Sequence, residues 1–583
     1  MALENESELR EFIRKAALLN AVGHDGKAQA GAMVGKVLGE KAQYRSRVKE
    51  LSVVINQVVA EVNSLSLQEQ KAIVEKHWPE TQKKHEAEEK KLPQLPYADQ
   101  YKVITTRFSP NPDCVLHLGS ARAIVLSHEY ARMYNGKFIL RFEDTDPKTK
   151  KPQLQFYESI KKDLKWLGCK WDEEYIQSDR LEIYYELVGK MVGDGNAYVC
   201  ECTPEEFRNK TLAKEACPCR NISANDQMER WHKMLAGGYQ EGQAVVRVKT
   251  ELDHPNPAIR DWPALRIIDT KKYPHPRVGS KYFLWPLYNL AAGIDDHLMG
   301  MTHIIRGKEH YTNMVRQKYM YKHLGWEYPQ AIHYGRLKIT GAALSKSKIV
   351  AGIQEGDYAD FDDPRLGTFA ALRKRGITPE AIRKVIIDVG VKPNDVTLSW
   401  ETLNAYNRKV LDAASDRYFF VADPVELKVT GLPKTFHPQL PFHPEHPDRG
   451  YREAAVEPKG EHNATIFWIA KADAEAMQLG QTIRLMELFN IKITEKLSSC
   501  VNASYASEAY GDVRKIKVQL IQWIPKGTEY SAAVVQQDAS VTEGYAEFAC
   551  KKLKPDQIIQ FERYGFVRVE EVGNKLTAYY AQK

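Results

Sequence analysis

The stretch from Thr105 to Arg122, TTRFSPNPDCVLHLGSAR, constrains the fold of this chain more than any other segment. It opens with VITTRF, where β-branched residues lead up to an aromatic residue, and this pattern predicts a short buried strand. Pro110 and Pro112 then exclude both helix and ladder, so a loop must follow. After His117 the apolar residues recur at helical spacing. The segment is therefore predicted to run from a strand through a rigid loop into the start of a helix.

A helix start of this kind suits a phosphate group, because free backbone N–H groups and the positive end of the helix dipole point at the loop. Gly119 lies at this start without a Cβ, so a flat ring or a phosphate can approach the backbone. His117 can donate a hydrogen bond to the same place. The alternative is an ordinary strand-to-helix turn with a satisfied histidine.

Strand and helix signals alternate over residues 98–180 and resume at about residue 279, which predicts a parallel, doubly wound sheet with its site at the C-terminal strand ends. The segment KFILRFEDTDP (137–147) gives a second buried strand that ends in carboxylates. Arg107, His117 and Glu143 all fall at such strand ends, where one pocket could collect them. The carboxylate of Glu143 suits an ammonium group or a metal-bound nucleotide. An acidic surface loop is the alternative.

Length and composition limit the class of protein. A chain of 583 residues with 43% hydrophobic and 27% charged residues is expected to form three to five soluble globular domains. A net charge of +7 permits a polyanionic partner without requiring one. No run of about 18 apolar residues and no apolar signal segment are present, so neither a membrane span nor secretion is expected. The eight cysteines do not form an evident disulfide framework, and we expect them to be reduced in the cytoplasm.

Two short motifs carry a resemblance to a known family. The run His117-Leu118-Gly119-Ser120 resembles the HIGH signature of class I aminoacyl-tRNA synthetases, and RFSPNP and RFEDTDP are similar to the glutamyl/glutaminyl branch. Leu344-Ser345-Lys346-Ser347 resembles the second signature, KMSKS, about 230 residues further on. Their order and spacing across an insertion favour the resemblance over a solvated basic loop. The chain is identified as a member of this branch, of the archaeal glutamyl type.

The resemblance implies a set of site residues. His117 and Lys346 would stabilise phosphate charge in the transition state, and Glu143 would hold the substrate α-amino group. Arg306 would bind the substrate side-chain carboxylate, which a guanidinium prefers over a neutral amide because the bidentate bond is charge-assisted. A surface salt bridge is the alternative for Arg306. The implied ATP-binding residues, with Mg²⁺ accompanying ATP, are His117, Gly119, Ser120, Leu344, Ser345, Lys346 and Ser347, and the implied amino-acid-binding residues are Arg107, Ser109, Glu143, Tyr288 and Arg306.

Two motif positions depart from the family pattern. Ser120 stands where the HIGH signature usually has histidine or asparagine, although a serine can still bond a phosphate or cap the helix. Ala343 stands where the first lysine of KMSKS often lies. The glutamyl branch that the chain resembles frequently lacks that lysine, and we expect activity to survive the change at Ser120.

Residues 181–278 are irregular and rich in Gly and Pro, which indicates an insertion that splits the sheet domain. Within it, Cys200, Cys202, Cys217 and Cys219 could supply four thiolates in a tetrahedron, the usual arrangement of structural Zn²⁺. Free or buried thiols are the alternative. The insertion resembles the zinc-binding, acceptor-stem-binding insertion of some glutamyl enzymes.

The predicted architecture is multidomain α/β plus all-β, and the resemblance adds a Rossmann-like class I catalytic domain. We expect a helical N-terminal domain, a charged linker, a catalytic domain in two halves around the insertion, a helical stem-contact segment and paired β-barrels that bind the anticodon. The expected bounds are, in that order, 1–80, 81–97, 98–180 and 279–349 around 181–278, 350–415, and 416–583.

The resemblance implies a glutamate–tRNA ligase. It would activate L-glutamate with ATP and transfer it to the 3′-terminal adenosine of tRNA(Glu), with tRNA(Gln) left open as a second acceptor. A glutaminyl-tRNA synthetase fits every feature except Arg306 and its RGKEH context. Two further alternatives are a catalytically silent tRNA-binding relative and a short nucleotidylyltransferase, the latter leaving the β-rich last third unexplained. The oligomeric state is not assigned.

Overall fold

The computed structural model describes residues 6–23, 26–78, 91–340, 345–497, 499–511 and 518–583. The chain divides into two compact units, residues 1–90 and 91–583. None of the helices in the described ranges combines the length and apolar character that a membrane crossing requires.

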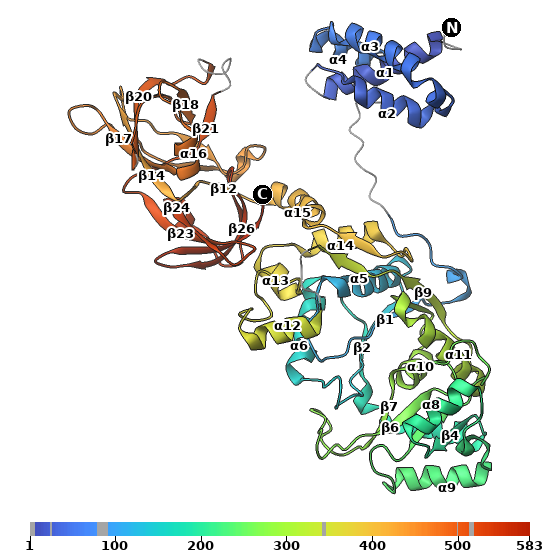
Figure 1. Ribbon diagram of the computed structural model, residues 1–583. Coiled ribbons are helices and arrows are strands. Elements are labelled where there is room, and N and C mark those ends of the chain that lie inside the picture. The colour runs from blue at the N-terminus through green and yellow to red at the C-terminus, as the bar shows by residue number, and fades with distance from the viewer. Residues whose placement is uncertain (1–5, 24–25, 79–90, 341–344, 498, 512–517) are drawn as a thin grey trace. The chain divides into compact units, whose positions relative to one another are not determined.

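The first unit is a bundle of four helices, drawn in blue in Figure 1. Its core is a helical stripe on the third helix, where Leu51, Ile55, Val58 and Val62 are buried at three-to-four spacing. Ser66 begins the fourth helix with a capping box to Glu69. The elements are α1 Glu6–Gly23, α2 Ala30–Glu40, η1 Ala42–Arg47, α3 Val48–Asn63 and α4 Leu67–His77.

The second unit begins with the predicted parallel sheet, which is confirmed. Strand β2 lies between β1 and β3 in parallel register, and β8 pairs in parallel with β9. A backbone hydrogen bond of 3.1 Å from Thr302 N to Thr105 O joins the start of β8 to β1. The C-terminal ends of β1, β2 and β8 therefore meet at one edge. The elements are η3 Ala98–Gln100, β1 Thr105–Phe108, α5 Leu118–Met133, β2 Lys137–Phe142, α6 Leu154–Trp166, β3 Glu173–Ile176, η4 Gln177–Asp179, α10 Tyr288–Leu298, β8 His303–Gly307, η6 Lys308–His310, α11 Tyr311–Leu324 and β9 Gln330–Tyr334.

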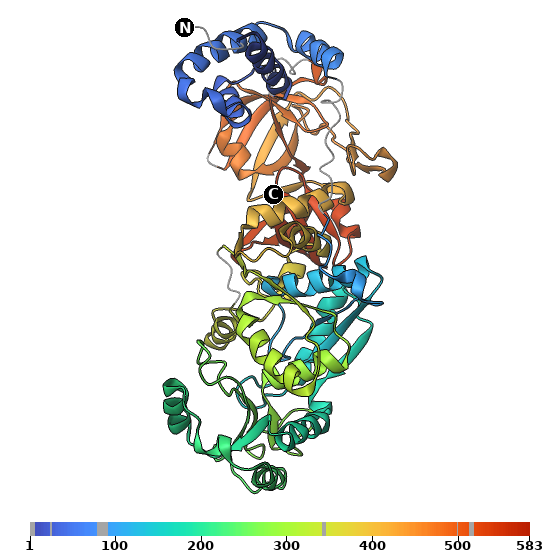
Figure 2. The same ribbon diagram turned by 90° about the vertical axis from the view of Figure 1, so that its right-hand side faces the viewer.

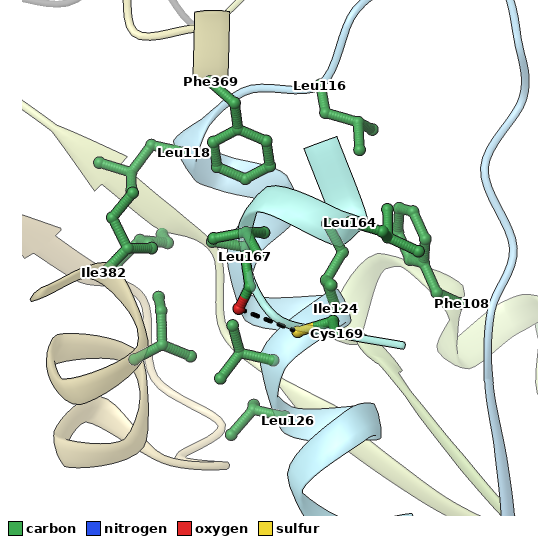
Figure 3. Close-up of a cluster of buried hydrophobic side chains, with 14 of the residues drawn as sticks. Phe108, Leu116, Leu118, Ile124, Leu126, Leu164, Leu167, Cys169, Phe369 and Ile382 are labelled. Atoms are coloured by element: carbon green, nitrogen blue, oxygen red, sulfur yellow. Dashed lines mark hydrogen bonds between the residues drawn. The ribbon is translucent and has the colours of Figure 1, made fainter. Parts of the chain in front are cut away.

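Helix α5 lies at the centre of the apolar core of the parallel-sheet domain. Figure 3 shows Leu118 and Ile124 of this helix among Leu164, Phe369 and Ile382, which come from three other helices. All five side chains are buried, and such packing fixes α5 against its neighbours. The start of α5 is therefore a rigid platform for the residues of the first signature.

The insertion forms an antiparallel sheet in the order β4-β5-β6-β7, and its apolar core also includes residues of α10 and α11. Its helices are green in Figure 2. Strand β7 passes through Leu287 directly into α10, so the insertion ends where α10 begins at Tyr288. The elements are α7 Leu181–Gly193, β4 Ala197–Cys200, α8 Pro204–Ala213, η5 Pro218–Asn221, α9 Ala224–Leu235, β5 Val245–Val248, β6 Pro263–Ile267 and β7 Leu284–Pro286.

A mainly helical segment follows the second signature. It contains α12 Lys346–Glu355, α13 Phe369–Lys374, α14 Pro379–Val389 and α15 Trp400–Ala414. A short strand, β11 Val396–Leu398, interrupts it and pairs in parallel with β10 Leu337–Ile339. The sequence predicted only helices here, because a three-residue strand is too short for a periodic signal.

The last part of the chain is all-β, as predicted. Two seven-stranded sheets each enclose a separate apolar core. The first sheet, in spatial order, contains β21 Gln519–Ile521, β18 Thr482–Leu485, β19 Asn490–Lys496, β20 Cys500–Ser507, β14 Pro424–Thr430, β17 Thr465–Ala470 and β22 Ile524–Pro525. The second contains β12 Arg417–Tyr418, β25 Ile558–Phe561, β26 Gly565–Val572, β27 Leu576–Gln582, β23 Glu529–Val535, β24 Val541–Glu547 and β13 Phe420–Ala422. The smaller elements are β15 Gln439–Pro441, η7 Pro447–Arg449, β16 Tyr451–Glu453, α16 Lys471–Ala476 and η8 Phe548–Lys552.

Candidate active site

The first signature begins α5. His117 is the N-cap of this helix, and its Nδ1 accepts a hydrogen bond of 3.0 Å from Gly119 N. The proton of the neutral ring therefore lies on Nε2, which can donate to a ligand. Burial lowers the pKa of His117, so the ring is neutral at physiological pH.

The sequence assigned the space beside Gly119 to a ligand, and the structure gives part of that space to the protein itself. A Cβ on this residue would lie 2.8 Å from Cε1 of His117. The missing side chain thus allows the imidazole to fold back onto the helix start. Ser120 donates its backbone N–H to His117 O at 2.8 Å and is the third residue of α5.

The second signature lies beside the first. Leu344 falls outside the described residues, as do 341–343, but Ser345 is the N-cap of α12 and Lys346 its first residue. Lys346 Nζ forms an ion pair with Asp113, in the loop that leads to His117. Ser345 Oγ and Ser347 Oγ are 3.1 Å apart. Two segments far apart in sequence therefore meet at the expected nucleotide site.

A cavity of about 600 Å³ opens at the C-terminal ends of β1 and β2. Ser109, Glu143 and Tyr288, all predicted site residues, line it. Three of its lining atoms are buried without a hydrogen-bond partner, namely Ser109 Oγ, Asn111 Oδ1 and Asn289 Oδ1. Buried polar atoms are rarely left unpaired, so this cavity is built for a polar ligand.

Arg306 lies behind the hydroxyl of Tyr288, at the end of β8. Its Nη1 lies 3.4 Å from Tyr288 Oη, and its Nη2 donates to Tyr328 Oη at 2.9 Å and to Gln317 Oε1 at 3.1 Å. The side chain is 5% exposed, its Nε has no partner, and no carboxylate in the described ranges forms an ion pair with it. The surface salt bridge considered as an alternative is therefore wrong.

A buried ion network holds Arg107 and Glu143, two of the predicted amino-acid-binding residues. Arg107 donates from Nε and Nη2 to the two carboxylate oxygens of Asp296, at 2.5 and 3.0 Å. Arg141 donates from Nη1 to Asp296 Oδ1 at 2.8 Å and from Nη2 to Glu143 Oε1 at 3.0 Å, so it links the two carboxylates. Arg107, predicted to hold the amino acid, thus uses two of its three nitrogens on Asp296 and keeps Nη1 for other contacts.

The network fixes the charges of its members. Burial alone would raise the pKa of Asp296, but Arg107 and Arg141 outweigh it and lower that pKa to about 2. For Glu143 burial prevails over the two arginines and raises the pKa. Glu143 is therefore the carboxylate of this network that protonates first as the pH falls.

Sequence reasoning missed Arg141, Asp296, Gln317 and Tyr328. A signal was available for two of them, because Arg141 lies in the apolar strand FILRF and Asp296 in the apolar run LAAGIDDHLMG. Charges inside apolar elements indicate buried, paired groups. Asp144, which follows Glu143 in the sequence, has a structural role instead. It accepts hydrogen bonds from Tyr157 Oη (2.7 Å) and Ser178 N (2.8 Å).

The four cysteines of the insertion gather between β4 and η5. The Sγ–Sγ distances are 3.9 Å for Cys200–Cys217 and 3.8 Å for Cys202–Cys219. Zn–S bonds of about 2.3 Å in a tetrahedron place sulfur atoms about 3.8 Å apart, as in both of these pairs. Cys200, Cys202 and Cys219 have all their sulfur atoms within 4.8 Å of one another, so these three form a group that fits Zn²⁺. Cys217 does not belong to that group, and its role as the fourth ligand stays a prediction. Glu201 N and Arg230 Nη1 each lie 3.4 Å from Cys219 Sγ, as donors to a thiolate would.

Comparison with known proteins agrees with the family resemblance of the sequence motifs over 99% of the chain. The family described as tRNA synthetases class I (E and Q), catalytic domain, matches residues 103–413, and two anticodon-binding domains of the same family match residues 415–506 and 520–570. The glutamate–tRNA ligase of Thermococcus kodakarensis is 51% identical over 581 residues, covering 99% of this chain and 100% of that relative. The glutamate–tRNA ligases of Pyrococcus furiosus and Methanothermobacter thermautotrophicus are 49% and 42% identical, each again over 99% of this chain and 100% of the relative.

The two signature segments at the edge of a parallel sheet, the paired β-modules that follow them and the match to all three family models define a class I aminoacyl-tRNA synthetase. Synthetases of this class use ATP and Mg²⁺. The chain belongs to the E and Q family of class I tRNA synthetases, the family of the glutamate and glutamine enzymes.

Proposed function

We propose that this chain activates L-glutamate with ATP and transfers it to the 3′-terminal adenosine of tRNA(Glu). Relatives over its full length are named glutamate–tRNA ligases. The single observation that carries the choice of glutamate is Arg306, a buried guanidinium without a carboxylate partner among the described residues.

The neighbouring arginines differ from Arg306 in this respect. Arg107 and Arg141 both bond Asp296, Arg141 also bonds Glu143, and Arg180 Nε bonds Asp295 at 2.9 Å. Arg306 is the one of these four guanidinium groups that forms no ion pair with a carboxylate of the described residues, and a buried unpaired charge is costly. The side-chain carboxylate of glutamate would supply that partner, whereas the neutral amide of glutamine would not.

Binding of the amino acid follows from the same geometry. The side-chain carboxylate would reach Arg306 past the hydroxyl of Tyr288, and the α-amino group would lie against Glu143. Ser109 and the remaining nitrogen of Arg107 would orient the α-carboxylate. Arg141 and Asp296 keep Glu143 in place before the substrate arrives, so little rearrangement is needed.

In the first step the α-carboxylate attacks the α-phosphate of ATP and pyrophosphate leaves. His117 Nε2 would donate to phosphate oxygens, and Lys346 would move from Asp113 to the triphosphate as negative charge develops. Gly119, Ser120, Leu344, Ser345 and Ser347 would line the nucleotide path, and Mg²⁺ bound to ATP supplies further charge neutralisation. In the second step the terminal ribose hydroxyl of the tRNA takes the glutamyl group and AMP leaves.

Other parts of the chain would hold the tRNA. The insertion with Cys200, Cys202, Cys217 and Cys219 would bind structural Zn²⁺ and contact the acceptor stem, and the two seven-stranded modules would bind the anticodon. We place the enzyme in the cytoplasm, in agreement with its eight cysteines, none of which forms a disulfide.

The test is aminoacylation of tRNA(Glu) and tRNA(Gln) transcripts with glutamate or glutamine, with ATP–pyrophosphate exchange measured in parallel. Glutamate-dependent charging of tRNA(Glu) is the expected result, and charging of tRNA(Gln) with glutamate would add a second acceptor. Charging that needs glutamine would make the chain a glutaminyl-tRNA synthetase. No exchange with either amino acid in the presence of tRNA would leave a silent tRNA-binding relative.

A further inference from the structure

Arg122 is a buried arginine of α5 that the mechanism above does not use. It lies one helical turn after Gly119, has no exposed surface, and makes no ion pair with a carboxylate in the described ranges. Its guanidinium instead donates to three backbone carbonyls. Nε and Nη2 bond Gly390 O at 3.1 and 2.8 Å, Nη2 bonds Lys392 O at 3.0 Å, and Nη1 bonds Gly335 O.

These carbonyls belong to the two segments that lead into β10 and β11. Gly335 N donates to Lys392 O at 2.9 Å, and the two strands then run in parallel until Thr340 N bonds Leu398 O at 3.1 Å. A Cβ on Gly335 would lie 2.0 Å from Asn394 O, so the segments touch backbone to backbone. Arg122 therefore fixes the start of the β10–β11 strand pair. After β10, the chain leads to the second signature.

Strand β10 also passes the first signature. The carbonyl of Leu337 lies 3.8 Å from the place that a Cβ on Gly119 would occupy. One turn of α5 thus lies beside β10 at Gly119 and, through Arg122, bonds the segment that leads into this strand. Downstream of β10 lie Ser345 and Lys346.

The chemistry of the side chain suits this task. A planar guanidinium has five N–H donors in a fixed fork, so it holds several carbonyls in one geometry, which a lysine ammonium on a flexible stem cannot do. The face of Tyr334 lies 4.9 Å from Arg122 Cζ and confines the guanidinium from one side. The cost of burying the charge is offset by these bonds only while the carbonyls stay in place.

We infer that Arg122 is a positioning residue that sets the strand before Lys346 in register with the helix that carries His117. It touches no substrate and acts on adenylate formation through Lys346. The inference rests on the proposed function, because the two signatures must meet on one nucleotide.

A double-mutant cycle tests the inference in the full chain. Arg122→Lys keeps the positive charge but loses the forked set of donors. It should lower kcat of ATP–pyrophosphate exchange about 100-fold and raise KM for ATP. The reason is that a displacement of Lys346 by about 1 Å is enough for an effect of this size. KM for glutamate should stay within about twofold. In a Lys346→Ala background the same change should cost less than about threefold, because its target is gone. An equal loss in both backgrounds would overturn the inference.

Arg132→Lys is the matched control. Arg132 lies on the same helix and also bonds backbone carbonyls, those of Gly136 (3.2 Å) and Lys170 (2.7 Å), but these lie away from β10. The kinetics of ATP–pyrophosphate exchange should therefore be the same in Arg132→Lys as in the parent chain. If Arg122→Lys does not fold, Tyr334→Leu removes only the confining ring and should lower kcat about 10-fold, and full activity of that variant would overturn the inference.

Hydrogen exchange separates this inference from the proposed function. Without any substrate, the amides of residues 335–340 should exchange faster in Arg122→Lys than in the parent chain, while those of β1 and β2 should not change. Unchanged exchange in that segment would overturn the inference. A parent chain that shows no ATP–pyrophosphate exchange with any amino acid would instead overturn the proposed function.

Discussion

At the scale of single residues, we expect Arg306 to decide which amino acid is chosen. Arg306→Met should raise KM for glutamate about 30- to 1000-fold, corresponding to about 2–4 kcal/mol for loss of one partner of a buried charged pair. KM for ATP should change little. Arg277→Met is the control, because Arg277 pairs with the exposed Asp179 at 2.7 Å, away from Arg306. A variant at Arg306 with an unchanged KM for glutamate would remove the argument for specificity.

The lysine of the second signature should act on rate. Lys346→Ala should slow adenylate formation about 100- to 1000-fold, since it removes charge that stabilises the transition state. The dissociation constant for tRNA should stay nearly the same, as measured by filter binding. Lys348→Ala, an exposed lysine of the same helix, is the comparison. Equal losses in both variants would contradict a specific role for Lys346.

The sequence alone led to His117, Lys346, Glu143 and Arg306, because each lies in a recognisable motif or at a strand end. It did not lead to Asp296, whose role depends on contacts with Arg107 and Arg141, 189 and 155 positions away in sequence. Nor could it tell that the space beside Gly119 is occupied by the imidazole of His117. Such roles depend on side-chain contacts that no local pattern encodes.

At the level of elements, the cysteine cluster should be a stabilising module. Purified protein should contain about one Zn²⁺ per chain, and chelation or Cys217→Ser should lower the melting temperature by several degrees and weaken tRNA binding. Cys500→Ser, on β20, is the control and should change neither. Protein purified without bound zinc and with the same melting temperature would reject the site.

The contact between α6 and α13 should depend on pH. Asp163 accepts a hydrogen bond of 2.6 Å from Arg373, yet burial outweighs this partner and raises the pKa of Asp163 to about 6. A raised carboxyl pKa contributes stability below the unfolded value of 3.8, and that contribution is lost as the pH rises through about 6. Between pH 5 and 7.5, Asp163→Asn should therefore gain about 1.4 kcal/mol of stability relative to the parent, because the rest of the total of about 3 kcal/mol is lost below pH 5.

Melting curves of both proteins across this range give the difference directly. Asp172→Asn is the control: hydrogen bonds from Phe138 N and Arg132 outweigh burial and lower the pKa of Asp172, so its difference from the parent should be flat above pH 5. The prediction would be contradicted if the parent became more stable relative to Asp163→Asn as the pH rises above 6.

Elements with a clear period were predictable from the sequence, including the strand ending at Phe108, the helix after His117 and the helical stripe of α3. Strand β11 was not, because it has three residues and exists only through its pairing with β10. Stability that comes from a partner distant in sequence leaves no periodic trace.

At the scale of the whole molecule, the order of the parts followed from motifs in sequence, whereas their contacts did not. The parallel sheet, the insertion and the all-β end were each indicated by composition and period. The bond from Arg568 Nε to Lys374 O, which ties the second β-module to α13, was not. A single side-chain contact between distant segments has no counterpart in local pattern.

The division of the chain at residues 90 and 91 leads to a final prediction. The apolar core of the first unit contains only residues up to 78, and every candidate site residue lies between 107 and 347. A chain of residues 91–583 should therefore fold, and its ATP–pyrophosphate exchange at saturating tRNA should stay within about threefold of the full chain. KM for tRNA should rise, because the helical extension resembles one that contacts tRNA. Adding residues 1–90 as a separate chain should not restore that KM, since a weak contact needs the linkage for its effective concentration. Loss of exchange at saturating tRNA, with melting unchanged, would mean that the first unit completes the active site.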